Sequence, residues 1–196
     1  LPVLSNEVSS LYFGGISLAS EPCATTYATL LRREGTDRAV MLDPNIRPQF
    51  IRDIDRYRER LDQMLALTDI LKVSDEDLNW ILPAPLALSD KVKLMLEKGP
   101  GVVILTRGGD GATGYLADGT EVTVPATRVN IVDTVGAGDT FNAGVLAKLS
   151  GLGALRKTRL KHLPAELLEQ ALAHGARVAA VTVSRAGANP PWADEL

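Results

Sequence analysis

The chain has 196 residues, of which 45% are hydrophobic, 23% are charged and 5% are aromatic. This balance is typical of one globular domain with a packed core, and it excludes an intrinsically disordered chain. The formal net charge is -3, and the acidic and basic residues are spread along the chain without a basic run. A surface of that kind does not favour nucleic acid as a partner.

A single cysteine, Cys23, cannot form an internal disulfide, and His162 and His174 lack the spacing of a metal site. No apolar run reaches ~18 residues, and the amino terminus lacks a basic region followed by an apolar stretch. We therefore expect a cytoplasmic protein in a reducing compartment, with no membrane segment.

Apolar runs that end at turn residues alternate with segments of helical period along the chain. This alternation is typical of a parallel sheet whose strands are joined by crossover helices, so we expect an α/β fold. The first strand is expected at residues 11–13 and the second at 39–42. Between them, Ser20 is expected to cap a helix that ends at Gly35.

Four apolar residues after the second strand recur at three- and four-residue intervals and predict one face of a helix. These residues are Ile54, Tyr57, Leu61 and Leu65. A strand at 69–73 is expected next, followed by a short helix after Ser74 and a longer helix over 89–99. Residues 102–105 are all apolar, which predicts a buried central strand.

The hydrophobic period then changes to two, which predicts a small antiparallel excursion over residues 112–132. The residues that carry this period are Tyr115, Val122, Val124, Val129 and Ile131. Two helices are expected to close the chain, one starting near Gly138 and one over 165–183; the inner face of the first is formed by Phe141, Val145 and Leu149. No strand–helix unit precedes the first expected strand, so we expect the chain to be incomplete at its amino-terminal end.

The segment 133–141, Asp-Thr-Val-Gly-Ala-Gly-Asp-Thr-Phe, lies between an expected strand and an expected helix. Gly136, Ala137 and Gly138 leave peptide N–H groups uncovered at a helix amino terminus, where an anion such as a phosphoryl group is favoured. The carboxylate of Asp139 beside such a site is electrostatically unfavourable. Accepting a proton from a hydroxyl that attacks the phosphoryl group would explain its presence.

A simpler alternative is a tight turn in which Asp139 only accepts hydrogen bonds from the first helical turn. A dinucleotide-binding fingerprint is a second alternative, but Phe141 stands where its third glycine should be. A Walker lysine motif is absent from the sequence. The residues alone leave the anion-site and tight-turn interpretations open.

Residues 133–144, Asp-Thr-Val-Gly-Ala-Gly-Asp-Thr-Phe-Asn-Ala-Gly, resemble the carboxy-terminal signature of the ribokinase (PfkB) family. Three further blocks resemble that family in the same order, at residues 43–48, 72–77 and 106–111. The resemblance implies a ribokinase-like three-layer αβα fold with a mostly parallel central sheet. Residues 1–196 would then be the carboxy-terminal part of a single kinase domain, its nucleotide-binding and catalytic portion, without the lid and the first strands.

The resemblance implies an ATP-dependent sugar kinase in which Asp139 is the catalytic base and the backbone of Gly136, Ala137 and Gly138 forms the anion hole. The residues implied for nucleotide binding are Lys72, Ser74, Thr106, Gly108, Gly111 and His174. Simpler interpretations exist for most of these residues. The segment 106–111 could be an ordinary turn, Lys72 could reach solvent, and His174 could be a packing or surface residue.

Two cation sites follow from the same resemblance. Asp77 would orient magnesium through water, although the family often has Asn and Glu where this chain has Ser74 and Asp77, and this pair could also cap a helix. A monovalent cation would bind at Asp133, Val135 and the segment 185–189. The implied cofactors are therefore ATP, Mg²⁺ and K⁺.

Residues 15–18 and 21–23, with the block at 43–47, look most like fructokinases, which implies phosphorylation of D-fructose to fructose 6-phosphate. Asn45 and Arg47 would lie near the sugar and the moving phosphate, because a guanidinium binds phosphate oxygens bidentately. An ion pair between Arg47 and a neighbouring acid is the alternative for that residue. The alternative functions are a 2-keto-3-deoxygluconate kinase and a non-catalytic nucleotide-binding relative. The implied partners are a small-molecule sugar, a nucleotide and a second copy of the protein, bound through the lid.

Overall fold

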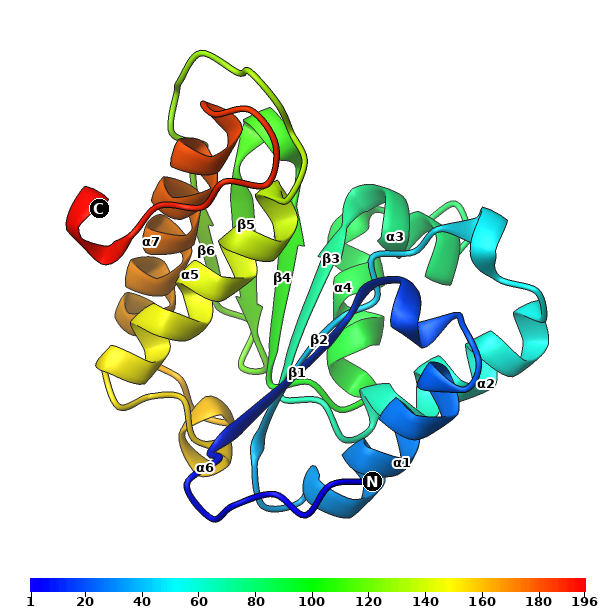
Figure 1. The fold of residues 1–196 in the computed structure, drawn as a ribbon. Helices are drawn as coiled ribbons and strands as arrows, with labels where there is room; N and C mark the ends of the chain where they lie inside the picture. Colours follow the sequence, from blue (N-terminus) through cyan, green and yellow to red (C-terminus); the bar gives the residue numbers. More distant parts are fainter.

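The computed structural model describes all 196 residues, and its centre is one six-stranded sheet in the order β1-β2-β3-β4-β5-β6 (Figure 1). The strands are β1 (Ser10–Gly14), β2 (Ala39–Asp43), β3 (Ile70–Ser74), β4 (Val102–Thr106), β5 (Ala112–Leu116) and β6 (Glu121–Val124). The first four strands are parallel, whereas β5 and β6 pair antiparallel with their neighbours. The expected α/β fold with a mostly parallel sheet is confirmed.

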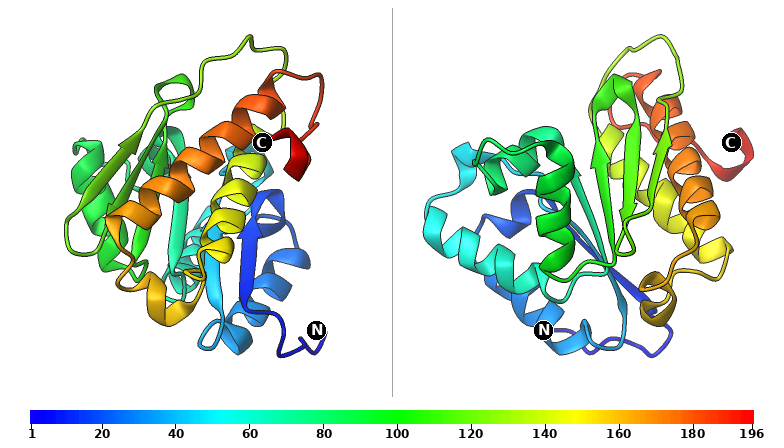
Figure 2. Two further views of the ribbon diagram at one scale, coloured as in Figure 1. Left: turned by 90° about the vertical axis from the view of Figure 1, so that its left-hand side faces the viewer. Right: turned by 180° about the vertical axis from the view of Figure 1, so that it is seen from behind.

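Helices cover both faces of this sheet, so the molecule has three layers (Figures 1 and 2). One layer contains α1 (Cys23–Glu34), α2 (Ile54–Leu65), α3 (Asp75–Ile81) and α4 (Leu88–Glu97). The other contains α5 (Ala137–Gly151), α6 (Lys157–Leu160) and α7 (Ala165–Val183). Short 3₁₀ turns occur at Gly15–Leu18, Pro48–Phe50, Gly108–Asp110 and Ala193–Glu195. None of the helices combines the length and the apolar composition that crossing a bilayer requires.

Each helical layer packs on the sheet through its own apolar core, because successive side chains of a strand point to opposite faces. Val40 and Leu42 belong to a cluster of 19 buried residues under α1 to α4. Ala39 and Met41, from the same strand, belong to a cluster of 18 buried residues under α5 to α7. All five residues of β2 are buried, as expected for a strand covered on both faces.

Two expectations about helix ends are wrong. The N-cap of α1 is Pro22, and Ser20 contributes only its backbone carbonyl, which accepts the N–H of Ala24. Ile54 is the first residue of α2 and is 53% exposed, so it does not belong to the inner face of that helix. Met64 is buried on that face instead, one turn from Leu61.

The antiparallel excursion is shorter than expected, and one helix was not expected at all. Pairing ends with β6 at Val124, and Val129 and Ile131 are exposed in the connection to α5. The helix α6 has only four residues, too few to show a helical period in the sequence.

The helices α5 and α7 lie side by side with their backbones in close contact (Figure 2). A Cβ atom on Gly144 would lie 2.9 Å from the Cα atom of Gly175, and a Cβ atom on Gly175 would lie 2.9 Å from the carbonyl oxygen of Phe141. Only glycine allows this approach. The contact fixes α5, whose amino terminus lies next to the carboxyl ends of the parallel strands.

Candidate active site

The amino terminus of α5 lies against β1, and Asp139 is exposed in its first turn. The hydroxyl of Tyr12 on β1 donates a hydrogen bond to Oδ1 of Asp139 at 3.4 Å. No side chain caps α5. The Asp139 carboxylate accepts only this bond from Tyr12, so the alternative in which it accepts hydrogen bonds from its own first helical turn is wrong.

The turn before α5 presents free backbone donors. Gly136 has a φ angle of 80°, which residues with a Cβ atom rarely adopt. Its carbonyl accepts the N–H of Thr140 at 2.9 Å, whereas the N–H groups of Gly138 and Asp139 donate to no protein acceptor. A Cβ atom on Gly138 would lie 3.6 Å from Nζ of Lys72. Free donors, the positive end of a helix and a nearby ammonium make the turn at residues 136–138 suitable for an anion, and we call it the anion turn.

A buried polar cluster lies behind this turn and joins β2, β3 and α5. Asp43 is 1% exposed, and its Oδ2 accepts from Nζ of Lys72 at 3.1 Å and from Nδ2 of Asn142 at 2.7 Å. Nδ2 of Asn142 also donates to the hydroxyl of Tyr12 at 3.2 Å. Burial raises the pKa of Asp43, and Lys72 and Asn142 lower it in part. Because buried charges require partners, the cluster fixes the strand ends relative to α5.

Sequence reasoning did not assign Tyr12, Asp43 or Asn142 to the site. Asn142 follows Asp139 by three residues and so shares a helix face with it, which is a signal that the sequence contains. Asp43 ends an apolar strand, which is a weaker signal. Burial, followed by the charge of Asp43 and then of Asp139, raises the pKa of Tyr12, so its hydroxyl keeps its proton at neutral pH.

Lys72 and His174 lie in different surroundings. Lys72 is 6% exposed and paired with Asp43, so the alternative in which it reaches solvent is wrong. His174 is half-buried on α7, and burial, then Arg177 and Lys148, lower its pKa. It precedes Thr182, which lies near Gly136, by roughly 12 Å along the helix axis. The structure does not bring His174 to the anion turn, and its part in nucleotide binding stays a prediction.

The loop after β4 is close to the end of β3. Thr106 pairs in register with Ser74, and its hydroxyl donates to the carbonyl of Val73 at 3.4 Å. Gly108 has a φ angle of 51° and open space beside it, whereas a Cβ atom on Gly111 would lie 2.2 Å from a backbone carbonyl oxygen. The loop thus presents bare backbone at the carboxyl edge of the sheet, where ligands of parallel sheets bind.

Ser74 and Asp77 form a capping box at the start of α3, so the helix-cap interpretation is confirmed. Asp77 is 4% exposed. Its Oδ2 accepts the N–H of Ser74 at 3.1 Å, and its Oδ1 accepts the N–H of Ile46 at 2.7 Å. Asp77 therefore ties the loop after β2 to the end of β3.

That loop also carries Asn45 and Arg47. Asn45 has a φ angle of 41°, and its N–H donates to Oδ1 of Asp43 at 3.1 Å. Arg47 is exposed, donates to the carbonyl of Ile46 at 2.9 Å and has no acidic partner within ion-pair distance. The ion-pair alternative for Arg47 is therefore wrong, and its guanidinium is accessible.

The residues expected to hold a monovalent cation are brought together. The Oδ1 of Asp133 accepts the N–H of Val135 and its Oδ2 accepts the N–H of Gly187, both at 3.0 Å. These hydrogen bonds lower the pKa of Asp133, that from Val135 most strongly. A Cβ atom on Gly136 would lie 3.1 Å from the Cβ atom of Ala188, so the segment 185–189 borders the anion turn.

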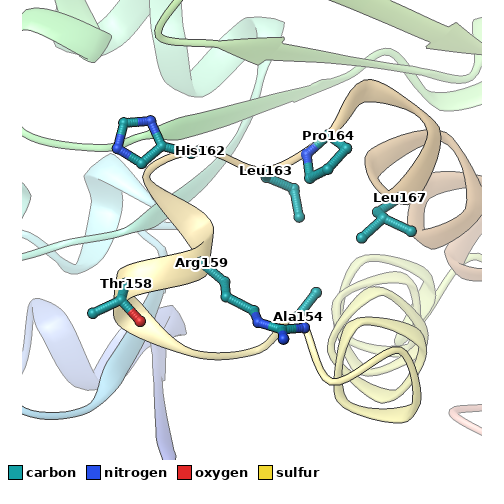
Figure 3. A pocket seen from close by; sticks show the side chains of 7 residues that line it. All are labelled: Ala154, Thr158, Arg159, His162, Leu163, Pro164 and Leu167. Atoms are coloured by element: carbon teal, nitrogen blue, oxygen red, sulfur yellow. The ribbon is translucent and has the colours of Figure 1, made fainter.

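Two cavities lie apart from these residues. One of about 320 Å³ lies between the end of α5, α6 and the start of α7 (Figure 3); it is lined by Ala154, Thr158, Arg159, His162, Leu163, Pro164 and Leu167. It is at the opposite end of α5 from Asp139, and the 15 residues of α5 span about 22 Å. The other, of about 530 Å³, lies beside the start of α2 and includes Arg52, Arg56 and Arg60. Neither cavity contains a residue expected at the site.

The family model of the pfkB family carbohydrate kinases matches residues 4–195, and the chain therefore belongs to that family. A fructokinase of Rhizobium leguminosarum bv. trifolii is 46% identical over 178 residues, which cover 89% of this chain and 52% of the relative. A 2-dehydro-3-deoxygluconokinase of Dickeya dadantii is 31% identical over 169 residues, which cover 82% of this chain and 54% of the relative. The chain thus spans about half the length of these relatives.

Solved structures share the fold. The aminoimidazole riboside kinase of Salmonella enterica, complexed with aminoimidazole riboside and an ATP analog, gives a TM-score of 0.74 at 31% identity, over 91% of this chain and 57% of that chain. An Escherichia coli protein assigned as a ribokinase II, in complex with ATP and Mg²⁺, gives a TM-score of 0.73 at 28% identity, over 91% of this chain and 53% of that chain. A fructokinase double mutant of Vibrio cholerae O395, with fructose, ADP and potassium ion, gives a TM-score of 0.77 at 22% identity, over 91% of this chain and 55% of that chain. This likeness supports the fold alone.

Proposed function

We propose that the protein to which this chain belongs is an ATP-dependent sugar kinase with Asp139 as its catalytic base. The observation that carries this proposal is the exposed carboxylate of Asp139 beside two amide N–H groups, those of Gly138 and Asp139, that have no protein acceptor. Such amides favour a phosphoryl group, and the carboxylate can take a proton from a hydroxyl held against that group. Membership of the family agrees with this chemistry.

In the proposed reaction, Asp139 accepts the proton of the sugar hydroxyl while the hydroxyl oxygen forms a bond to the γ-phosphorus of ATP. The bond from that phosphorus to the bridging oxygen breaks, and the oxygen leaves with the electron pair as part of ADP. The amides of the turn offset the negative charge on the transferred group. Mg²⁺ supplies further charge neutralisation when it is bound with the nucleotide.

The chain offers no group of three or more His, Cys, Asp and Glu side chains that could hold a metal ion. Phosphate oxygens and water would therefore supply most ligands of Mg²⁺, as is usual for this ion. Both oxygens of Asp77 already accept backbone N–H groups, which favours contact with Mg²⁺ through water. Asp133 and Val135 are proposed for K⁺. The residues proposed for the nucleotide are Lys72, Ser74, Thr106, Gly108, Gly111 and His174.

D-fructose is the proposed acceptor, with Asn45 and Arg47 near the sugar and the phosphate. The 46% identity to a fructokinase supports this choice. The second candidate is 2-keto-3-deoxygluconate, supported by the 31% identity to a kinase of that acid. ADP release by the full-length protein with fructose, the keto-acid, ribose and adenosine separates these candidates. Fructose should give the highest kcat/KM; activity with the keto-acid and none with fructose would reverse the assignment.

Replacing Asp139 by Asn tests the base in the full-length protein. Loss of general base catalysis should lower kcat by about 10²- to 10⁴-fold, whereas nucleotide affinity, measured by calorimetry, should persist. Asp118→Asn is the matched control, because Asp118 is an exposed acid in the turn between β5 and β6. An Asp139→Asn protein with nearly the original rate would exclude the base assignment. Nucleotide binding without turnover of any sugar by the unmodified protein would favour a non-catalytic relative.

A further inference from the structure

Tyr12 connects the candidate base to the buried cluster behind it. Its hydroxyl lies 3.4 Å from Oδ1 of Asp139 and 3.2 Å from Nδ2 of Asn142. Tyr12 is on β1 and both partners are on α5, so the contacts join segments that are 127 and 130 residues apart. Tyr12 is 41% exposed, which places it at the surface of the site and not in the core.

The direction of each hydrogen bond follows from Asp43. A carboxylate paired with the buried ammonium of Lys72 only accepts, so Asn142 must turn its amide nitrogen toward Asp43. The same nitrogen reaches the hydroxyl oxygen of Tyr12, which accepts there, so the hydroxyl proton is left for Asp139. Oδ1 of Asn142 is buried and has no hydrogen-bond partner, so no contact of the oxygen helps to orient the amide. The orientation is determined by the contacts of Nδ2 with Asp43 and Tyr12 alone.

We propose that Tyr12 is a positioning residue that fixes the carboxylate of Asp139; this inference rests on the proposed function. An exposed aspartate samples several rotamers. A hydrogen bond to Oδ1 selects one of them and leaves Oδ2 for the attacking hydroxyl. Lys72, Asp43 and Asn142 hold Tyr12 in place in turn. Misplacing a catalytic group by about 1 Å costs on the order of 100-fold in rate.

This role differs in its kinetics from a role in sugar binding. A residue that positions the base is needed when the proton moves, so its loss lowers kcat, whereas the loss of a sugar contact raises KM. A residue that acts only through Asp139 also has no effect once residue 139 can no longer accept a proton. A double-mutant cycle between positions 12 and 139 measures this dependence.

The test uses four variants of the full-length protein: Tyr12→Phe, Asp139→Asn, their combination and the control Tyr27→Phe. Phenylalanine keeps the ring of Tyr12 and removes only the two hydrogen bonds of its hydroxyl, so the protein should stay folded, with a thermal midpoint lowered by no more than a few degrees. Tyr27 packs edge-to-face on Phe13 at 5.4 Å, and its hydroxyl takes no part in the cluster. Tyr12→Phe should lower kcat about 10- to 100-fold with KM within roughly twofold, and it should have no further effect in the Asp139→Asn background. Tyr27→Phe should leave both constants unchanged.

Each other outcome overturns the inference in a distinguishable way. If Asp139→Asn abolishes turnover but Tyr12→Phe retains kcat, or raises only KM, Tyr12 does not position the base and the proposed function stands. The same conclusion follows if Tyr12→Phe lowers kcat equally in both backgrounds. If Asp139→Asn itself retains the original rate, the base assignment and the inference fall together.

Discussion

Replacing Lys72 by Met perturbs the buried ion pair on which the candidate site depends. The side chains of Lys72 and Asp43 are 8% and 2% exposed, and Nζ lies 3.1 Å from Oδ2. Methionine keeps an unbranched apolar stem and removes the charge. The carboxylate of Asp43 would then stay buried with Asn142 and the N–H of Asn45 as its remaining donors.

Removal of one partner from a buried ion pair destabilises a protein by about 3–5 kcal/mol, because the remaining charge is uncompensated. The free energy of unfolding of a whole folded domain is only roughly 5–15 kcal/mol. The loss should depend on pH, because burial raises the pKa of Asp43 and Lys72 opposes that rise. Without Lys72 the pKa rises further, so the charged carboxylate destabilises the variant at neutral pH, and the penalty is relieved as pH falls through the raised pKa.

Urea unfolding of the full-length protein, followed by circular dichroism, measures this loss. Lys93→Met is the matched control, because Lys93 and Asp90 are 69% and 53% exposed and such a surface pair contributes about 0–1 kcal/mol. The difference between Lys72→Met and the unmodified protein should shrink at acidic pH, whereas the effect of Lys93→Met should remain small. Equal losses in the two variants would refute the stabilising role of the Lys72–Asp43 pair.

Three further substitutions test the loops around the site. Gly111→Ala should destabilise the fold by at least about 2 kcal/mol in urea unfolding, because φ is 91° and the new Cβ atom would lie 2.2 Å from the carbonyl oxygen of Val124; an unchanged midpoint would contradict this packing. Gly136→Ala should lower the free energy of unfolding by about 1–2 kcal/mol, because alanine rarely adopts the left-handed backbone of this position. It should also weaken ATP affinity in calorimetry, since the new methyl group would contact Ala188. Intact affinity would argue against the anion turn. Asp133→Asn should lower the thermal midpoint at neutral pH, because asparagine cannot make the charge-assisted hydrogen bonds that lower the pKa of Asp133. The difference in midpoint between variant and unmodified protein should be fully present above about pH 3.9 and should disappear as pH falls through the lowered pKa. A difference that persists in strong acid would contradict the last prediction.

The order of elements and the place of the anion turn could be predicted from the sequence, because both depend on local patterns. The apolar run of β4 and the helical period of α2 each identify their element without knowledge of the rest of the chain. The small residues at 136–138 similarly mark a helix start with uncovered N–H groups. Such signals need only neighbours in sequence.

Contacts between distant segments could not be predicted in the same way. The contact of Tyr12 with Asp139 depends on how β1 sits against α5, which no local pattern encodes. The exposure of Val129 and Ile131 shows the converse case, because a period of two forms a strand only where a partner strand is present. Lys72 likewise gave no sign in the sequence that its partner would be Asp43 and not solvent.

The glycine contacts between α5 and α7 restrict the movement of the helix that carries Asp139. Backbones this close cannot slide past each other without collision, so the two helices behave as one rigid body that carries Asp139. The loop after β4 is different, because nothing lies within 4 Å of the Cβ positions of Gly108 and Gly109. A bound group could therefore approach the backbone of that loop without meeting a side chain, whereas Asp139 keeps a fixed position relative to α7.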